Sequence, residues 1–114
     1  MRAPMCSFCR IVEGILPAAR VGETAHSLAI RDIDPHAPTH VLVLPKRHLQ
    51  HIAELVEEPE ELADLFRLAA DVAADEGLER GYRIVTNTGS EGGQTVYHAH
   101  LHLFGGRRMV WPPG

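Results

Sequence analysis

The stretch Tyr97-His98-Ala99-His100-Leu101-His102-Leu103-Phe104 places three histidines at alternate positions among apolar residues. Successive side chains of an extended strand point to opposite faces, so the three imidazoles are expected on one face and the apolar groups on the other. A neutral imidazole is nucleophilic, exchanges protons near neutral pH and ligates metals. We therefore predict a reactive face and a packed face; the alternative is a polar outer face of a strand.

A glycine-rich segment, residues 87–95, directly precedes these histidines. Backbone amides in a tight glycine turn can approach an anion, and Asn87, Gln94 and Thr95 add neutral donors. The segment matches neither a Walker loop nor a dinucleotide-binding fingerprint. Beside the histidines it is predicted to cradle a phosphate, whereas alone it would indicate a glycine-rich hairpin connection.

Alternation and β-branched residues predict strands near residues 18–23, 27–32, 40–44, 82–87 and 97–104. A long helix is predicted to begin at Pro59 and to end near Gly77, with acidic residues in its first turn. Its apolar positions recur at helical spacing: Leu62, Leu65, Phe66, Ala69, Val72 and Ala73. A shorter helical turn is expected over 49–55. A β-α-β crossover is possible, but the consecutive early strands favour an α+β fold with an antiparallel sheet.

The composition excludes several classes of protein. A chain of 114 residues with 45% hydrophobic and 23% charged residues predicts a single globular domain. The net charge is −4 and the eleven Lys and Arg are dispersed, which argues against a nucleic-acid partner. Apolar runs are too short for a membrane span, and residues 1–4 lead into no signal-peptide core, so a cytoplasmic location is expected.

Metal ligation is a second chemical interpretation of the histidines. Three protein ligands and a water form a recognised catalytic zinc site. However, neighbouring positions on one strand face lie about 6.5 to 7 Å apart, so three in a row converge poorly on one ion. The two cysteines, Cys6 and Cys9, form a C-x-x-C pair. In a reducing compartment this pair indicates metal ligation or redox chemistry before a structural disulfide.

The motif His98–Phe104 resembles the signature of the histidine triad (HIT) family, in which three histidines alternate with apolar residues. Further segments in the same order resemble the Hint branch of that family: 8–17, 32–40, 45–48, 92–97 and the ending Trp-Pro-Pro-Gly at 111–114. The resemblance implies a HIT-like fold with about five antiparallel strands, one long and one short helix. It also implies a homodimer whose sheet continues across the interface.

The resemblance implies hydrolysis of nucleoside 5′-phosphoramidates, with adenosine favoured, to a nucleotide and an amine. Matched by motif, His100 would attack the α-phosphorus and form a nucleotidyl-histidine that water resolves. His102 and His98 complete the triad, and His40 matches an additional histidine that orients it or exchanges protons with it. Without the resemblance, His40 would be an ordinary histidine at a strand end. The chemistry requires no cofactor.

The same resemblance implies a purine nucleotide site. Asn87, Gly93, Gln94 and Thr95 match phosphate-binding positions, although the branch usually has serine where Thr95 stands. Asp32 matches the carboxylate that binds both ribose hydroxyls; a turn cap is its structural alternative. The residues matched to the apolar base pocket are Phe8, Ile11 and Ile30, for which core packing is the commoner role. The branch often has an aromatic residue in place of Ile30.

A structural zinc and a functional tail are also implied by the resemblance. Bacterial relatives pair the two cysteines with two histidines, which here would be Cys6, Cys9, His48 and His98; two unbound thiols are the alternative. His98 would then anchor its strand. Residues 105–114 would form a tail that brings Trp111 near the partner's site, the alternative being docking on its own domain. His26, His36 and His51 lack such neighbours and are expected on the solvated surface.

Two other functions stay open at this point. One is a dinucleoside polyphosphate hydrolase of the related Fhit branch, which the 94–96 segment permits. The other is a purine nucleotide-binding interaction protein in which catalysis is incidental. Comparing the turnover of a phosphoramidate with that of a diadenosine polyphosphate distinguishes a phosphoramidase from a Fhit-type hydrolase. Kinetics with His100→Ala distinguish an enzyme from a protein that only binds the nucleotide.

Overall fold

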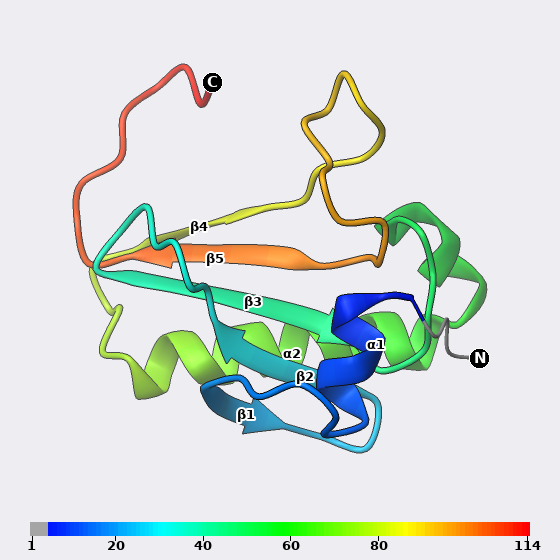
Figure 1. Cartoon of the computed structure of the whole chain (residues 1–114). Helices are drawn as coiled ribbons and strands as arrows, with labels where there is room; N and C mark the ends of the chain where they lie inside the picture. Colours follow the sequence, from blue (N-terminus) through cyan, green and yellow to red (C-terminus); the bar gives the residue numbers. More distant parts are fainter. Residues whose placement is uncertain (1–4) are drawn as a thin grey trace.

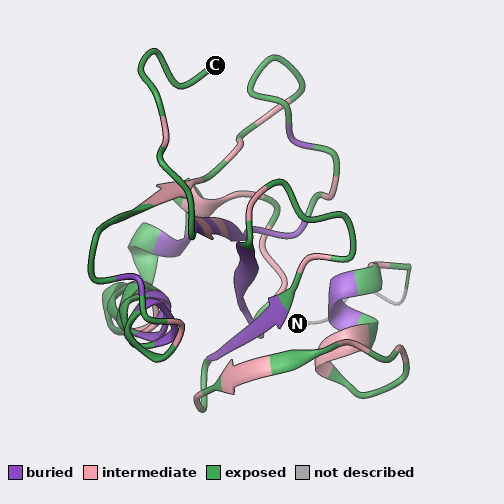
Figure 2. Cartoon of the chain, turned by 90° about the vertical axis from the view of Figure 1, so that its left-hand side faces the viewer, coloured by how far each residue is buried: buried purple, intermediate pink, exposed green. Residues whose placement is uncertain are grey.

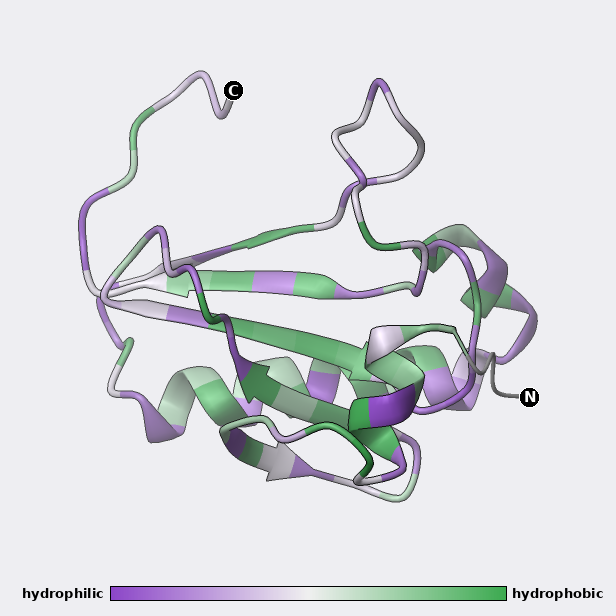
Figure 3. Cartoon of the chain, viewed as in Figure 1, coloured by the Kyte–Doolittle hydropathy of each residue, from purple (hydrophilic) through white to green (hydrophobic). Residues whose placement is uncertain are grey.

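Strand β3 (Thr39–Pro45) is buried along its whole length, and the other elements pack around it. Figure 3 shows that most of this strand is hydrophobic. A strand that is apolar at consecutive positions must be covered on both faces. The structure, a computed structural model that describes residues 5–114, meets this requirement with helices on either side of the sheet (Figure 1). The expectation made for residues 1–4 lies outside the described part.

The sheet has five antiparallel strands in the order β1-β2-β3-β5-β4. The other four strands are β1 (Arg20–Glu23), β2 (Ser27–Arg31), β4 (Tyr82–Val85) and β5 (Leu101–Gly105). The predicted α+β class is therefore confirmed. The β-α-β crossover left open by the sequence does not occur among the described strands, because every strand pair is antiparallel.

One face of the sheet is covered by helix α2 (Pro59–Asp75), as the sequence predicted. Proline and acidic residues open it, and a glycine with φ +73° follows its end. The core between helix and sheet contains Ala29, Val41, Val43, Leu65, Leu68, Ala69, Val72, Ala73, Leu101 and Leu103. Phe66 is the exception to the predicted stripe: its side chain turns outward and the residue is 44% exposed. The short helical turn is a 3₁₀ helix, η1 (Ile52–Glu57), slightly later than expected.

The opposite face carries a second, smaller apolar cluster under helix α1 (Ser7–Val12). Helix α1 itself was not predicted from the sequence. The cluster comprises Phe8, Leu28, Ile30, Leu42 and Leu44. Six residues are too few to display helical periodicity, which explains why the helix was missed. Figure 2 shows buried residues concentrated in the central strands and in the inward side of α1. This face has room for a ligand beside α1.

Strand β5 starts at Leu101, so the prediction of a strand from residue 97 is wrong at its beginning. The backbone there forms other bonds: Ala99 N–H donates to the Leu49 carbonyl at 2.7 Å, and the Thr86 hydroxyl donates to the His100 carbonyl at 2.9 Å. His98 and His100 therefore leave the regular alternation. Tyr97, expected on the packed face, is largely exposed.

In residues 5–114, the helices are all too short or too polar to cross a bilayer.

Candidate active site and metal centre

A cavity of about 500 Å³ opens on the α1 face of the sheet. It brings together seven of the residues predicted for the site: Phe8, Ile11, Ile30, Asp32, Thr95, His100 and His102. Most of its lining is apolar, in large part from α1 and β2, and two imidazoles and a carboxylate stand among these side chains. An apolar pocket with a few convergent polar groups is the usual form of a small-molecule site.

His100 is held with one ring nitrogen directed at the backbone. Its Nδ1–H donates to the His98 carbonyl at 2.7 Å, so in the neutral ring the lone pair lies on Nε2. That nitrogen has no hydrogen-bond partner within residues 5–114. Phe8 packs its ring edge-on at a centroid distance of 5.1 Å. The result is a fixed imidazole with an available lone pair at the wall of the cavity.

His40 and His102 form a hydrogen-bonded pair next to it. The backbone N–H of His36 donates to His40 Nδ1 at 3.1 Å, so a neutral His40 must carry its proton on Nε2. That Nε2–H lies 2.9 Å from His102 Nδ1 and 3.3 Å from an oxygen of Asp32. His102 Nδ1 thus accepts, and its own proton resides on Nε2.

Burial keeps these imidazoles neutral. Removal from water lowers the pKa of His40 and of His100, and Asp32 only partly offsets this effect. The pKa of His102 falls to about 4, first because of burial and then because His100 and His40 would repel its charge. Neutral rings are the state that a nucleophile and a directed proton relay require.

The low pKa of His102 predicts a specific acid sensitivity. Between its ordinary value of 6.5 and about 4, the unfolded chain binds a proton that the folded chain does not, so the free energy of unfolding falls as pH falls through this window. Thermal melting from pH 7 to pH 4.5 should therefore decline less steeply in His102→Asn than in the wild type. Equal slopes would contradict the lowered pKa. Groups facing His102 are Asp32, His36, His40 and His100, and they are unchanged in the variant.

The glycine-rich loop stands beside the cavity, but the side chains of two of its predicted phosphate ligands already form hydrogen bonds with backbone groups. Gln94 is buried, and its amide donates to the carbonyls of Gln50 and Val96 while its oxygen accepts from Gly89 N–H. Asn87 donates to the Gly92 carbonyl at 2.7 Å. Asn87, Gly93 and Gln94 do not line the cavity itself, whereas Thr95 does. Here Asn87 and Gln94 shape the loop that presents Thr95 and the backbone.

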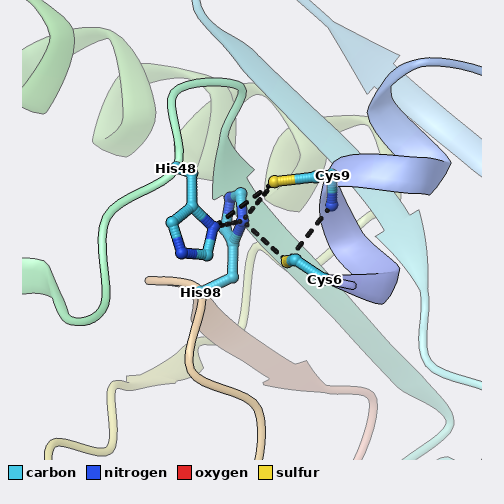
Figure 4. Close-up of side chains that lie close together, drawn as sticks. All are labelled: Cys6, Cys9, His48 and His98. Carbon is cyan, nitrogen blue, oxygen red and sulfur yellow. Dashed lines mark hydrogen bonds between the residues drawn. The ribbon is translucent and has the colours of Figure 1, made fainter. Parts of the chain in front are cut away.

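The two cysteines, His48 and His98 meet at one point, as predicted (Figure 4). Cys6 and Cys9 come from the start of α1, His48 from the loop after β3 and His98 from the segment before β5. The Nδ1 atoms of the two histidines lie 3.2 Å apart, and His98 Nδ1 lies 3.3 and 3.6 Å from the two sulfurs. Tetrahedral zinc with ordinary bond lengths would separate its ligands by about 3.3 Å for two nitrogens and about 3.6 Å for nitrogen and sulfur.

The protonation of His98 is also the one that a zinc ligand requires. Its Nε2–H donates to the Pro45 carbonyl at 2.8 Å, which directs the Nδ1 lone pair at the cysteine sulfurs. Histidines that ligate metals characteristically donate their other N–H in this way. The Cys9 backbone N–H donates to Cys6 Sγ at 3.3 Å and would stabilise a thiolate there. The donor set, spacing and outer hydrogen bonds all fit a four-coordinate structural zinc.

A second trio, Asp32, His40 and His102, also has its ligand atoms within 4.8 Å of one another. Its hydrogen bonds argue against a metal there. Because His40 Nδ1 accepts a backbone N–H, its Nε2 must keep a proton and cannot offer a lone pair to an ion. The histidines also fail to converge: His98 points to the cysteines, His100 lines the cavity and His102 bonds His40. The Cys6-Cys9-His48-His98 cluster and the cavity lined by His100 and His102 therefore use different histidines.

The end of the tail is exposed, since Trp111 is 81% accessible to solvent. Before that residue the tail is hydrogen-bonded to its own domain twice: the Arg107 guanidinium donates to the His36 carbonyl, and the Arg83 guanidinium donates to the Val110 carbonyl at 2.8 Å. In Figure 1 the tail and the glycine-rich loop both project from the sheet.

Sequence reasoning missed several residues of the cavity and its surroundings. Leu42 and Val96 line the cavity, and Phe104 stacks on His102. Leu42 could have been found, because it lies two residues after His40 on the same face of β3. Val96 offered no such signal, since its position depends on the irregular backbone before β5.

Comparisons with known proteins agree with this geometry. The family model described as HIT domain matches residues 13–109. A 14 kDa zinc-binding protein of Zea mays is 48% identical over 110 residues, covering 94% of this chain and 86% of the relative. The crystal structure of a HIT family hydrolase from Legionella pneumophila has a TM-score of 0.91 and 51% identity, covering 96% of this chain and 99% of that one. A histidine triad nucleotide-binding protein from Candida albicans has a TM-score of 0.82 and 29% identity, covering 94% and 82%.

Proposed function

This chain belongs to the HIT domain family, and from that premise we propose that it is a Hint-type hydrolase of nucleoside 5′-phosphoramidates. The observation that carries the proposal is the arrangement of His100, whose Nε2 lone pair is available at the wall of a nucleotide-sized cavity. The names of the Legionella and Candida proteins, a hydrolase and a nucleotide-binding protein, support the same class of activity.

The proposed reaction proceeds in two displacements. His100 Nε2 forms a bond to the α-phosphorus as the P–N bond breaks, and the electron pair of that bond goes to the leaving amine. Water then attacks the phosphorus, and the electron pair of the bond to His100 returns to Nε2. The Nδ1–H bond to the His98 carbonyl stabilises the positive ring of the intermediate.

The leaving amine needs a proton, and His102 is positioned to supply it. A bound phosphate brings negative charge next to a neutral relay, which raises the affinity of His102 for a proton. The added proton occupies Nδ1, so the His40 Nε2–H is then left to the Asp32 carboxylate 3.3 Å away. The protonated His102 ring can donate from Nε2 to the departing nitrogen. In the second step the same nitrogen can accept a proton from the attacking water.

The nucleotide is proposed to lie along the cavity. The base would lie against the apolar side chains of Phe8, Ile11 and Ile30, and the carboxylate of Asp32 would accept from the ribose hydroxyls. Thr95 and the backbone of the glycine-rich loop would contact the phosphate. Oδ1 of Asp32 accepts from the Asp34 N–H at 2.8 Å and Oδ2 faces His40 Nε2 at 3.3 Å, so each oxygen would accept a ribose hydroxyl beside its present partner.

We further propose that Cys6, Cys9, His48 and His98 hold a structural zinc. The name of the Zea mays relative, a zinc-binding protein 48% identical to this chain, supports it. The ion would tie α1 to the loop after β3 and to the segment before β5, and thereby fix Phe8 against His100. It would act through structure alone, and the proposed reaction needs no cofactor.

The proposed assembly is a homodimer whose sheet continues across the interface, with residues 105–114 of one protomer near the partner's cavity. The exposure of Trp111 supports a role outside its own protomer. Removing residues 110–114 should change the preference for the leaving amine while AMP affinity stays within about twofold. Competition between two phosphoramidates that differ in the amine measures the first, and calorimetry with AMP the second. Trp111→Ala should reproduce the effect, and unchanged amine preference in both variants would contradict the tail's role.

The substrate class is tested by comparing turnover of an adenosine 5′-phosphoramidate and a diadenosine polyphosphate. We expect kcat/KM to favour the phosphoramidate by about 100-fold or more, because the relay is suited to protonating a nitrogen leaving group. Preference for the dinucleotide would assign the chain to Fhit-type chemistry. AMP binding without turnover of either would leave a nucleotide-binding interaction protein.

A further inference from the structure

The first charged residue of the tail, Arg107, contacts the loop that precedes β3. Its Nε and one terminal nitrogen donate to the carbonyl of His36, at 3.3 and 3.0 Å. Its other terminal nitrogen donates to the Arg108 carbonyl at 3.3 Å. In Figure 1 this loop and the start of the tail meet at one end of the sheet. A guanidinium that donates twice to one carbonyl fixes that carbonyl's orientation.

His36, whose carbonyl Arg107 holds, also determines which ring nitrogen of His40 bears the proton. While the His36 carbonyl accepts from Arg107, the His36 N–H donates to His40 Nδ1 at 3.1 Å. That bond requires the His40 proton to lie on Nε2, facing His102 at 2.9 Å. A continuous set of hydrogen bonds therefore runs from Arg107 through the His36 backbone to the relay.

The backbone is shaped to place Arg107 there. Thr39 pairs with Gly105 at the end of the sheet, and Gly106 follows with φ +88°. A Cβ atom at Gly106 would lie 2.8 Å from Pro38 Cβ, which is closer than side chains tolerate. The tail thus leaves β5 in tight contact with the 32–38 loop, and Arg107 is the first side chain able to bond it.

We propose that Arg107 is a positioning residue for the histidine relay: by holding His36, it keeps His40 in the tautomer that donates to His102. Its consequence for catalysis depends on the proposed function, whereas its effect on the His40 tautomer does not. The neighbouring Arg108 provides a matched control, because its side chain forms no hydrogen bond or ion pair with residues 5–114.

The first measurement uses the unmodified protein. Long-range ¹H–¹⁵N NMR distinguishes a ring nitrogen that bears a proton from one that does not, and His40 should show its proton on Nε2 at pH 7. A proton on Nδ1 would overturn the proposal without any variant being made.

The second measurement compares Arg107→Gln, Arg107→Lys and Arg108→Gln. In Arg107→Gln the His40 nitrogen signals should move toward a mixture of tautomers, and kcat should fall about tenfold, the effect of losing one charge-assisted hydrogen bond. Lysine, which retains a charged donor, should restore part of the tautomer signal and part of kcat. The control variant Arg108→Gln should change kcat less than about twofold. Unmoved His40 signals in Arg107→Gln, or equal changes in Arg108→Gln, would overturn the proposal. If no phosphoramidate is turned over, the NMR results still decide the positioning role.

Discussion

Replacing His100 with alanine is expected to abolish covalent nucleotide transfer and to lower kcat at least about 10⁴-fold. The side chain supplies the only proposed bond to phosphorus, and loss of an enzyme nucleophile typically costs this much or more. AMP affinity should change little, because the ring is one of many groups that line the cavity. Steady-state kinetics with an adenosine phosphoramidate and calorimetry with AMP measure the two effects.

The identity of the attacking nitrogen is tested by rapid acid quenching and mass spectrometry. Wild-type protein mixed with an adenosine phosphoramidate should carry one adenylyl group on His100, and His100→Ala should carry none. His26→Ala serves as the matched control, since His26 is an exposed histidine outside the cavity and should retain full labelling. Labelling of His102 or His40 in place of His100 would reassign the roles within the relay.

Loss of the proposed zinc is expected to produce the largest change in stability. Cys9 is almost fully buried, and its sulfur lies 3.3 Å from His48 Nδ1 and 3.6 Å from His98 Nδ1. Without an ion, weak thiol–imidazole hydrogen bonds would replace the much stronger metal–ligand bonds at these atoms. We expect Cys9→Ser to lower the melting temperature by about 10 °C or more, since structural zinc sites contribute several kcal/mol to small domains.

A chelator distinguishes zinc loss from poor packing of serine. It should lower the melting temperature of the wild type toward that of Cys9→Ser and leave the variant nearly unchanged. Elemental analysis should find about one zinc per wild-type chain and much less in Cys9→Ser. His40→Asn is the matched control, because it alters a buried histidine outside the cluster and should keep its zinc. If the chelator removed zinc from the wild type without changing its melting temperature, a structural role for the ion would be excluded.

The accuracy of the sequence predictions depended on how local each signal was. Helix α2 was placed correctly because seventeen residues repeat an apolar stripe between Pro59 and the glycine that follows it. Phe66 was wrongly assigned to that stripe. Periodicity shows which side of a helix faces the sheet, but it does not show how far around the helix the contact with the sheet extends. Helix α1 was missed because its six residues are too few to show a periodic pattern.

The three histidines illustrate the same limit. Their spacing marked a segment that does line the cavity, but it predicted one row along one strand face. In the structure His98 faces two sulfurs, His100 lies against Phe8 and His102 bonds His40. The strand begins only at Leu101, because the preceding backbone bonds to Leu49 and Thr86. No local pattern could predict those partners, which lie far away in the chain or on another element.

By itself, the sequence determined which chemical groups this protein has available: a histidine-rich segment, a glycine-rich loop, a C-x-x-C pair and an apolar sheet with one long helix. The tertiary structure alone decided which nitrogen of each imidazole bears its proton. Those protons are set by the His98 carbonyl, the Pro45 carbonyl and the His36 N–H, none of which is distinguished by its residue type. Backbone groups are the same at every position, so their role depends only on where the fold places them.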